Sequence, residues 1–372
     1  MIAKNVLGIV FSNSYDASLN ELTAMRTMGS VPFGGRYRLI DFALSNLVNC
    51  GVSRVGVITK SNFHSLMDHI GTGKPWDLAR KREGLYLLPP FNTNDGEHTG
   101  GKAEELARIL GFISRCDEEY VILTDCNNVC SIDFNDVFGF HEENGADITI
   151  VCKNGKIPNL DDTMVIKTEE GSNRIASIAI SPNSDKKADY SVNITLMRKS
   201  LLERLIREAV SFSKTNFEKD IIQKNVKKLN ICAYKTARSC FTIDSLESYF
   251  AANMELLKSS ARSDLFSPEH PVYTKVRDDM PVIYGLGCEV KNSLIADGCI
   301  IEGTVENCIL FRGVRVDKDA VIKNSILMQG TYISEGVSLN CVIADKSAVV
   351  TPKKVLSGAE NYPMFIGKGI VI

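Results

Sequence analysis

The C-terminal part of the chain carries a repeat that few folds accommodate. From residue 282 onward, apolar residues recur at steps of four to six, with small and polar residues between them. Short strands at this near-hexapeptide spacing predict a parallel β-helix, whose coils stack their apolar faces on one another. An antiparallel sandwich would not keep the step over so long a stretch. The repeating apolar positions are Leu294, Ile300, Val305, Leu310, Val316, Ile322, Leu327, Ile333, Leu339, Ile343 and Val349.

The N-terminal part is different, because strand-like and helix-like patterns alternate along it. Val6–Phe11 is a short apolar run, typical of a buried first strand in a parallel sheet. A polar turn over residues 12–18 follows it, at the point where nucleotide-binding sheets use glycines to bring backbone close to phosphate. This turn has no glycine, and its Asp16 would repel a phosphate. We therefore expect a sheet of the nucleotide-binding type whose phosphate loop lacks the usual chemistry.

Length and the change of period divide the 372 residues into two domains. We predict an α/β domain over residues 1–257, a linker over residues 258–281 and a β-helix over residues 282–372. Lys plus Arg (43) nearly balance Asp plus Glu (45), so the sequence indicates no nucleic-acid partner. No run of about 18 apolar residues is available to span a membrane. The 11 cysteines lack metal-ligand spacing and the N-terminus lacks a signal-peptide pattern, so we expect a cytoplasmic protein with free thiols.

A second predicted core strand ends in a carboxylate. The run at residues 118–125 (EEYVILTD) is apolar in its middle and ends at Asp125. Ligands of open α/β sheets bind outside the carboxyl ends of the strands, so Asp125 is a candidate site residue. The alternative is an aspartate that only caps a turn.

Two separated segments resemble motifs of one enzyme family. Val31–Asn46 (VPFGGRYRLIDFALSN) and Cys240–Asn253 (CFTIDSLESYFAAN) are similar to segments of the ADP-glucose pyrophosphorylases, or glucose-1-phosphate adenylyltransferases. The linker adds a further family-like run, SPEHPVYTKVRDDMP, at residues 267–281. The resemblance extends over essentially the whole chain. It implies a Rossmann-like nucleotidyltransferase domain, with a mostly parallel sheet flanked by helices, followed by a left-handed parallel β-helix. It also implies a part in making ADP-glucose from ATP and glucose 1-phosphate for glycogen biosynthesis.

The residues that this resemblance would assign to catalysis are largely replaced. The family's phosphate-loop arginine, a following lysine, the sugar-phosphate lysine and one metal-binding aspartate fall on Ser18, Met28, Ser181 and Thr242. Asp125 matches the other metal-binding aspartate, so residual Mg²⁺ would bind there. Asp244 lies two residues after Thr242 and is a candidate substitute. Losing one transition-state charge contact typically costs ~10²–10³ in rate, so several losses together predict an inactive chain.

Some basic residues survive beside these positions. Arg26, Arg36 and Arg38 lie in or near the first motif, and Lys102 falls on the threonine of the family's G-T-A-D-A segment. Guanidinium groups suit phosphate oxygens, so we predict that these four residues hold any phosphate-bearing ligand. The alternative is that Arg36 and Arg38 only brace the helix that follows.

A chain that keeps its framework and loses its catalytic charges is expected to regulate another subunit. By resemblance, we expect a mixed tetramer with a catalytic ADP-glucose pyrophosphorylase subunit, whose rate or effector response this chain alters. A sugar phosphate or phosphate is the candidate effector. We expect no cofactor for this chain, whereas Mg²⁺ belongs to the catalytic partner. The alternatives are an independent sugar-phosphate nucleotidyltransferase, with Asp125 on the metal and Lys102 or Arg26 on phosphate, and a stand-alone sugar-phosphate sensor.

Overall fold

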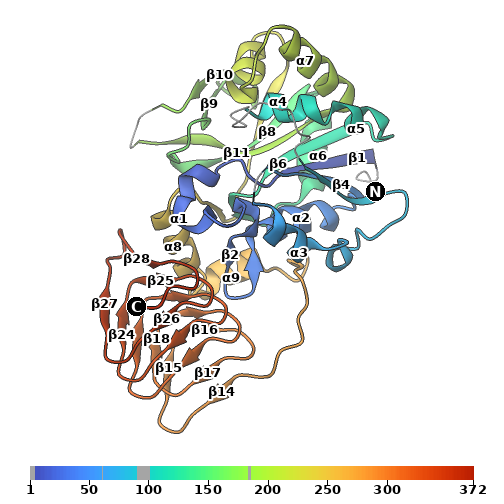
Figure 1. The fold of residues 1–372 in the computed structure, drawn as a ribbon. Helices are drawn as coiled ribbons and strands as arrows, with labels where there is room; N and C mark the ends of the chain where they lie inside the picture. The colour runs from blue at the N-terminus through green and yellow to red at the C-terminus, as the bar shows by residue number, and fades with distance from the viewer. Residues whose placement is uncertain (1–4, 61, 90–100, 183–185) are drawn as a thin grey trace.

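The computed structural model describes residues 5–60, 62–89, 101–182 and 186–372. Figure 1 shows an α/β domain, drawn in blue to yellow, above a β-helix drawn in orange to red. This is the predicted fold class. Within the described ranges, no helix is long and apolar enough to cross a membrane.

The α/β domain is built on one twisted sheet. Its first strand, β1 (Val6–Phe11), is buried along its whole length, as its apolar sequence predicts. β1 pairs in parallel with both β4 (Arg54–Ile58) and β6 (Tyr120–Asp125), and β11 (Lys187–Arg198) joins β6 in the antiparallel direction. β8 (Ile148–Lys156) pairs with β11 and, in parallel, with β12 (Ile231–Lys235). The main path through the sheet is β10 (Ile175–Ile180), β9 (Met164–Thr168), β11 (Lys187–Arg198), β6 (Tyr120–Asp125), β1, β4 (Arg54–Ile58) and β5 (Gly84–Leu88).

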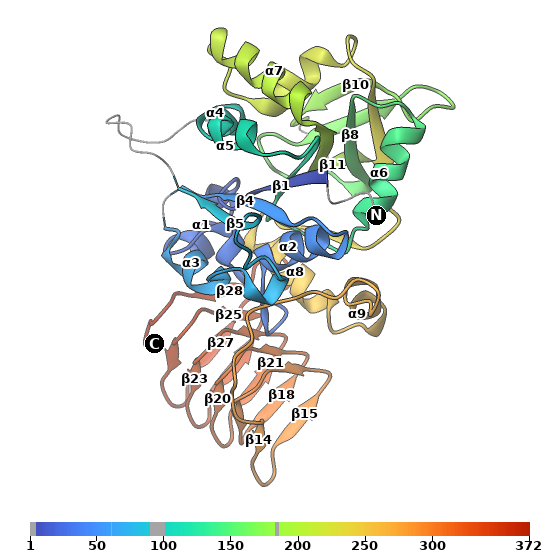
Figure 2. The same ribbon diagram turned by 90° about the vertical axis from the view of Figure 1, so that its right-hand side faces the viewer.

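Helices cover both faces of this sheet (Figures 1 and 2) and close two apolar cores. Because the parallel strands β1 and β6 end side by side, Phe11 is paired with Asp125 at the same edge of the sheet. The residues that follow β1 therefore lie next to Asp125. One face carries α4 (Lys102–Arg108), α5 (Leu110–Arg115), α7 (Lys199–Ser211) and the π-helix Phe217–Gln223; the other carries α2 (Leu39–Asn49), α3 (His64–Ile70) and α6 (Phe134–Glu143).

The C-terminal domain is a left-handed parallel β-helix whose coils form three sheets. Its repeating apolar side chains stack from coil to coil, as in the column of Val305, Ile322 and Leu339. Four predicted positions are displaced by one residue. Ile301 and Val350, and not Ile300 and Val349, continue the buried column through Val316 and Ile333. Likewise Ile295 and Ala344, and not Leu294 and Ile343, continue the column through Leu310 and Leu327. The sheets are β14 (Ile283–Tyr284), β17 (Ile300–Ile301), β20 (Arg315–Val316), β23 (Tyr332–Ile333) and β26 (Val349–Val350); β15 (Glu289–Lys291), β18 (Thr304–Glu306), β21 (Val321–Lys323), β24 (Ser338–Asn340) and β27 (Val355–Ser357); and β16 (Leu294–Ile295), β19 (Ile309–Leu310), β22 (Ile326–Leu327), β25 (Val342–Ala344) and β28 (Met364–Ile366).

One corner of the β-helix is held by an asparagine ladder. The side-chain amide of Asn292 donates to Asn307 at 2.8 Å, Asn307 donates to Asn324 at 3.3 Å, and Asn324 donates to Asn340 at 3.0 Å. Asn292, Asn307 and Asn324 have φ of 41°, 51° and 46°. Asparagine tolerates this left-handed conformation better than most residues because its short side chain bonds locally. The repeated asparagines thus set both the turn and the stacking of the coils.

We expect Asn307→Ala to lower the free energy of unfolding by about 2 kcal/mol, since it removes two ladder hydrogen bonds and strains a left-handed residue. Asn307→Gly loses the same bonds but accepts the positive φ, so it should cost about 1 kcal/mol. Urea denaturation of the two variants measures the difference. Equal losses for alanine and glycine would show that the backbone conformation contributes nothing.

The β-helix runs back toward the α/β domain. In both views the chain leaves α9 (Ser259–Leu265) and passes along the outside to β14 at the far end, so β25 and β28 return beside the α/β domain (Figures 1 and 2). The predicted linker over residues 258–281 is not a plain connection. It begins with α9, whose Leu265 is fully buried, and Phe266 stacks on Tyr37 with ring centroids 5.0 Å apart.

A shared apolar core joins the two domains. It combines residues of the first motif, such as Phe33 and Phe42, with α8 (Leu246–Glu255) and with β-helix residues such as Ile309 and Ile326. Both sequence motifs therefore pack at the junction of the domains. Their apolar and aromatic residues form the core between the domains, so their presence does not indicate catalytic activity.

Candidate functional site

The turn after β1 is bonded to Asp125. Ser14 Oγ donates to Asp125 Oδ1 at 2.9 Å. Within the turn, Asn13 Nδ2 donates to one oxygen of Asp16 at 2.6 Å, and the backbone N–H of Met28 donates to the other at 2.7 Å. Burial raises the pKa of Asp16 to about 6, against these hydrogen bonds. The polar side chains of the turn thus hydrogen-bond within the protein, and the turn has no arginine or glycine that could bind a phosphate.

Lys102, at the start of α4, occupies the space beside Asp125. Its Nζ donates to Asp125 Oδ2 at 2.7 Å, to Glu218 Oε1 at 2.7 Å and more weakly to Tyr15 Oη at 3.4 Å. The side chains of Lys102, Asp125 and Glu218 are 10%, 1% and 3% exposed. We call Tyr15, Lys102, Asp125 and Glu218 the lysine cluster. The cluster places an ammonium group where the carboxyl ends of β1 and β6 meet.

The electrostatics keep this lysine charged. Burial would lower the pKa of Lys102, but Asp125, Glu218 and Tyr15 outweigh it and hold the pKa well above the ordinary value. Burial raises the pKa of Glu218, while Lys102 opposes that rise. Burial likewise raises the pKa of Tyr15 well above 10, so the phenol stays neutral. The arrangement is a protonated lysine shared by two carboxyl groups in a nearly water-free site.

The lysine cluster does not fit a magnesium ion as it stands. Carboxylate and phenol oxygens are suitable ligands for Mg²⁺ in kind, but the ion needs oxygens at about 2.0–2.1 Å in octahedral geometry. Lys102 Nζ already lies between Asp125 and Glu218 and would repel a divalent cation. In the described part of the chain, no three His, Cys, Asp or Glu side chains are arranged to hold a metal ion.

The replaced positions serve structural roles. Met28 is buried in the core between the domains, and Ser18 is half-buried in the short 3₁₀ helix Asp16–Leu19. Ser181, with φ of 43°, donates to the backbone oxygen of Leu160 at 2.9 Å. Thr242 Oγ1 donates to the side chain of Asn128 at 2.7 Å. None of these four side chains supplies the charge that the resemblance would require.

Asp244 does not substitute for the lost metal ligand. Its Oδ2 accepts a hydrogen bond from the backbone N–H of Asn159 at 2.8 Å. It lines a large cleft of about 870 Å³ with Ser181 and Thr242, whereas Asp125 lines a different, smaller cavity with Lys102 and Glu218. The structure therefore does not bring Asp244 and Asp125 together as a metal pair.

The large cleft has room for a ligand but the wrong charge for a phosphate. Its volume of about 870 Å³ lies within the range of small-molecule sites. Two lysines, Lys153 and Lys156, are among its described lining residues, and Lys153 already donates to the backbone oxygen of Cys240. The same lining carries more carboxylates than lysines, namely Asp161, Asp244, Glu247 and Glu255.

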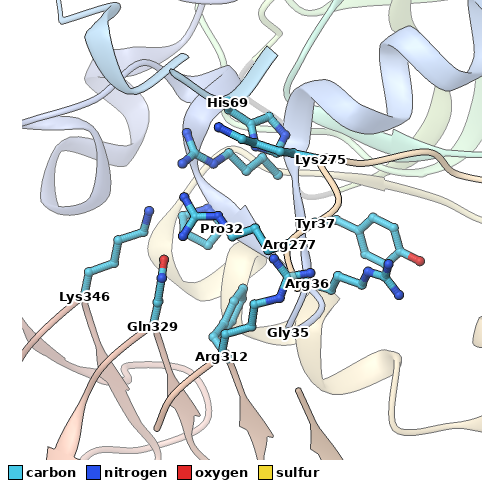
Figure 3. A pocket seen from close by; sticks show the side chains of 12 residues that line it. Pro32, Gly35, Arg36, Tyr37, His69, Lys275, Arg277, Arg312, Gln329 and Lys346 are labelled. Carbon is cyan, nitrogen blue, oxygen red and sulfur yellow. The ribbon is translucent and has the colours of Figure 1, made fainter. Parts of the chain in front are cut away.

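A second site lies between the two domains and is strongly basic (Figure 3). It takes side chains from the β2–β3 hairpin (Pro32–Phe33 and Tyr37–Arg38), the segment after α9 and the turns of the β-helix. The hollow is small, with a cavity volume of about 50 Å³, and no Asp or Glu is among the described residues that line it. Its basic side chains, which define what we call the cationic pocket, are Arg36, Arg38, Lys275, Arg277, Arg312 and Lys346.

The cationic pocket is under electrostatic strain. Burial and the nearby Arg38, Arg26 and Arg277 together lower the pKa of Lys346 to about 7, while Asp345 opposes the shift. Burial also lowers the pKa of Arg38 to about 10. Arg312 is nearly buried. Its Nε lies 3.8 Å from Asp279 Oδ2 in a long ion pair, but its Nε and Nη2 have no hydrogen-bond partner among the described residues. A bound anion would supply the missing acceptors and relieve the repulsion.

The structure divides the four predicted phosphate ligands. Arg36 and Arg38 line the cationic pocket, and Arg38 also donates through Nη1 to the Ser65 backbone oxygen at 2.5 Å, so it braces α3 as well. Arg26 does not line the pocket, because its Nη2 is held by both oxygens of Asp345 at 2.8 Å. Lys102 is held in the lysine cluster. Carboxylates thus hold both Arg26 and Lys102 in this structure, which does not favour phosphate binding by either residue; that binding stays a prediction.

Sequence reasoning missed the larger half of this pocket. Lys275 and Arg277 lie in the predicted linker, and Arg312 and Lys346 lie at turns of the β-helix. The available signal is the family-like run SPEHPVYTKVRDDMP, whose basic pair a plain connecting segment does not need. No motif marks Arg312 or Lys346.

Lys346 should make anion binding depend on pH. Its pKa of about 7 means that the free lysine loses its proton as the pH rises from 6.5 to 8.5, so sulfate should bind about ten-fold more weakly at pH 8.5. Sulfate is a suitable probe because its own charge is constant in this range. The neighbouring Arg26, Arg38 and Arg277 stay charged, and burial lowers the pKa of His69, so His69 stays mostly neutral. Calorimetry at both pH values, repeated on Lys346→Met, checks this: the variant should lose the pH dependence, and an unchanged dependence would exclude Lys346 as its source.

The fold and the matches to known families agree. Residues 14–259 match a family described as nucleotidyl transferase, and residues 284–361 match one described as GlmU-like, C-terminal hexapeptide. The geometry thus defines a nucleotidyl transferase domain followed by a hexapeptide β-helix.

Full-length relatives narrow the family. The chain is 35% identical over 373 residues to glycogen biosynthesis protein GlgD of Bacillus subtilis (strain 168), covering 100% of this chain and 98% of the relative. It is 38% identical over 367 residues to GlgD of Geobacillus stearothermophilus, covering 98% and 97%. It is 30% identical over 380 residues to glucose-1-phosphate adenylyltransferase of Clostridium perfringens (strain SM101 / Type A), covering 97% and 98%. The chain belongs to the glucose-1-phosphate adenylyltransferase family.

Proposed function

We propose that this chain is a catalytically degenerate, regulatory subunit of a glucose-1-phosphate adenylyltransferase and acts in glycogen biosynthesis. The observation that carries the proposal is that both carboxylate oxygens of Asp125 accept hydrogen bonds, one from Ser14 and the other from Lys102. Nucleotidyl transfer requires cationic groups on the phosphates and carboxylates that hold a metal. At the matched positions this chain offers Ser18, Ser181 and Thr242. The GlgD names of two full-length relatives are consistent with a role in glycogen synthesis.

The cationic pocket is the proposed effector site. Arg312 has N–H groups without a hydrogen-bond partner among the described residues, and the pKa of Lys346 is lowered; both favour a compact anion such as phosphate or the phosphate of a sugar phosphate. The pocket joins a hairpin of the α/β domain to turns of the β-helix. A bound anion would therefore bias how the two domains pack, which is what a regulatory ligand must do.

The partner in this proposal is a catalytic subunit of the same family. The first coil of the β-helix exposes apolar side chains, with Ile283 and Tyr284 each 55% exposed and Leu286 fully exposed. Near the C-terminus, Val371 is 65% exposed. Exposed apolar groups at the ends of a β-helix favour contact with another chain. We infer a mixed tetramer from the family resemblance, and these surfaces are suitable contacts for it.

Co-expression with the catalytic subunit of the same organism tests the assembly. Light scattering on the purified mixture should give one species heavier than either chain alone, containing both chains. Leu286→Asp, which introduces charge on the exposed first coil, should weaken that species, whereas Lys318→Ala on an exposed β-helix turn should not. Two chains that elute separately under all conditions would rule out the proposed partner.

A further inference from the structure

We propose that the ammonium group of Lys102 occupies the position of a divalent cation and thereby prevents metal binding in this domain. The proposal deepens the proposed function, because a chain whose cation position is filled cannot supply metal-dependent chemistry itself. It concerns only this chain's own residues. Its test uses the isolated chain, so a failed assembly experiment and a failed metal experiment remain distinguishable.

The surroundings of Lys102 Nζ are those of a bound cation. Two carboxylate oxygens, Asp125 Oδ2 and Glu218 Oε1, lie 2.7 Å away, and Tyr15 Oη lies 3.4 Å away, so each ammonium hydrogen has an acceptor. The remaining side is aromatic, with the ring centroids of Tyr15 and Phe11 at 5.3 and 5.7 Å. Oxygen ligands on one side and π faces on the other are a favourable shell for a monovalent cation.

The cluster holds more negative charge than one lysine needs. Asp125 and Glu218 together bring two carboxyl groups to one ammonium, and both are almost fully buried. Glu218 Oε2 is buried without a hydrogen-bond partner among the described residues. A simple structural ion pair would need only one carboxylate, whereas two carboxylates and an unused oxygen match the donor set of a divalent ion. Removing Lys102 should therefore leave a pair of buried carboxylates that demands a cation.

The same lysine fixes the turn after β1. Tyr15 Oη accepts hydrogen bonds from both Lys102 and Asn193 Nδ2, the latter at 3.0 Å, and Ser14 bonds to Asp125. The turn is thus bonded directly to the residues around the ammonium group. To bind here, a metal ion would have to displace the ammonium group and also break the hydrogen bonds that hold the turn. Both requirements oppose metal binding.

Manganese binding measured by electron paramagnetic resonance on the isolated chain tests the proposal. The wild-type chain should bind no Mn²⁺ with a Kd below about 1 mM. Lys102→Thr restores the residue of the family segment and frees Asp125 and Glu218, so this variant should bind one Mn²⁺ per chain at least about ten-fold more tightly. Lys102→Thr/Glu218→Gln should lose that gain. Lys219→Thr, the same substitution at the exposed neighbouring lysine, is the control and should match the wild type.

A refolding experiment tests the proposal even if the Lys102→Thr variant does not fold without metal. Lys102→Thr is unfolded in urea and diluted into buffer with and without Mn²⁺, and the recovered fold is followed by circular dichroism. Recovery that depends on Mn²⁺ supports the proposal. It is overturned if the wild type binds Mn²⁺ as tightly as Lys102→Thr, or if the variant neither binds Mn²⁺ nor gains recovery or thermal stability from it.

Discussion

Asp345→Ala is expected to lower the free energy of unfolding by about 3–5 kcal/mol, because it leaves the charge of Arg26 buried and unpaired. Arg26 and Asp345 are both 3% exposed and are 319 residues apart in the sequence. Their double hydrogen bond at 2.8 Å connects the first segment of the α/β domain to the last coils of the β-helix. Urea denaturation followed by tyrosine fluorescence measures the loss.

The matched control removes both charges together. Arg26→Met/Asp345→Leu fills the space with apolar groups, and replacing a whole buried ion pair in this way is often neutral. We expect the double variant to recover most of the stability that Asp345→Ala loses. If the single variant costs less than about 1 kcal/mol, the pair does not hold the domains together.

Arg36→Ala is expected to weaken sulfate or phosphate binding by about 10- to 100-fold, the equivalent of about 1.5–3 kcal/mol for a hydrogen bond to a charged group. Arg36 is exposed at the mouth of the cationic pocket, so its loss should not disturb the fold. Isothermal calorimetry with each anion measures the affinity.

Lys318→Ala serves as the control for that experiment. Lys318 is also exposed and basic, but it lies on a β-helix turn outside the pocket. The control should leave the affinity within about two-fold at fixed ionic strength. If both variants weaken binding equally, the net charge of the protein determines the anion affinity, and the cationic pocket does not.

The fold could be predicted because its determinants are local and repetitive. The stacked columns of the β-helix need an apolar residue near every sixth position, and the sequence shows that step directly. The one-residue displacement at Ile300 and Val349 has a simple cause. Each is followed by another β-branched apolar residue, and the period alone does not say which of the two points inward.

At the candidate site, the sequence alone could predict only which charged side chains are missing. Ser18, Ser181 and Thr242 stand where charges are expected, and the absence of a charge can be read without knowing the contacts. The pairing of Lys102 could not be predicted, because its partner Glu218 lies 116 residues away in the sequence. A basic residue near a phosphate loop has the same sequence signature whether it faces a ligand or a buried carboxylate.

The pairing of Arg26 with Asp345 could not be predicted for the same physical reason. The β-helix begins at the far end and returns beside the α/β domain, so Asp345 meets Arg26 only through the path of the whole chain. That path also places Arg312 and Lys346 opposite Arg36. No local pattern encodes a return of this kind, and the cationic pocket therefore becomes visible only in the folded chain.

The central claim is that this chain modulates a catalytic subunit without making ADP-glucose itself. The most direct test is the rate of ADP-glucose formation from ATP and glucose 1-phosphate by three samples: this chain, the catalytic subunit, and their mixture. We expect the isolated chain to turn over at least about 100-fold more slowly than the catalytic subunit. We expect the mixture to differ from the sum of its parts in rate or in its response to phosphate, with Arg36→Ala reducing that response. Turnover by the isolated chain at ordinary enzymatic rates of about 1–10³ s⁻¹, or a mixture whose rate is the simple sum, would contradict the claim.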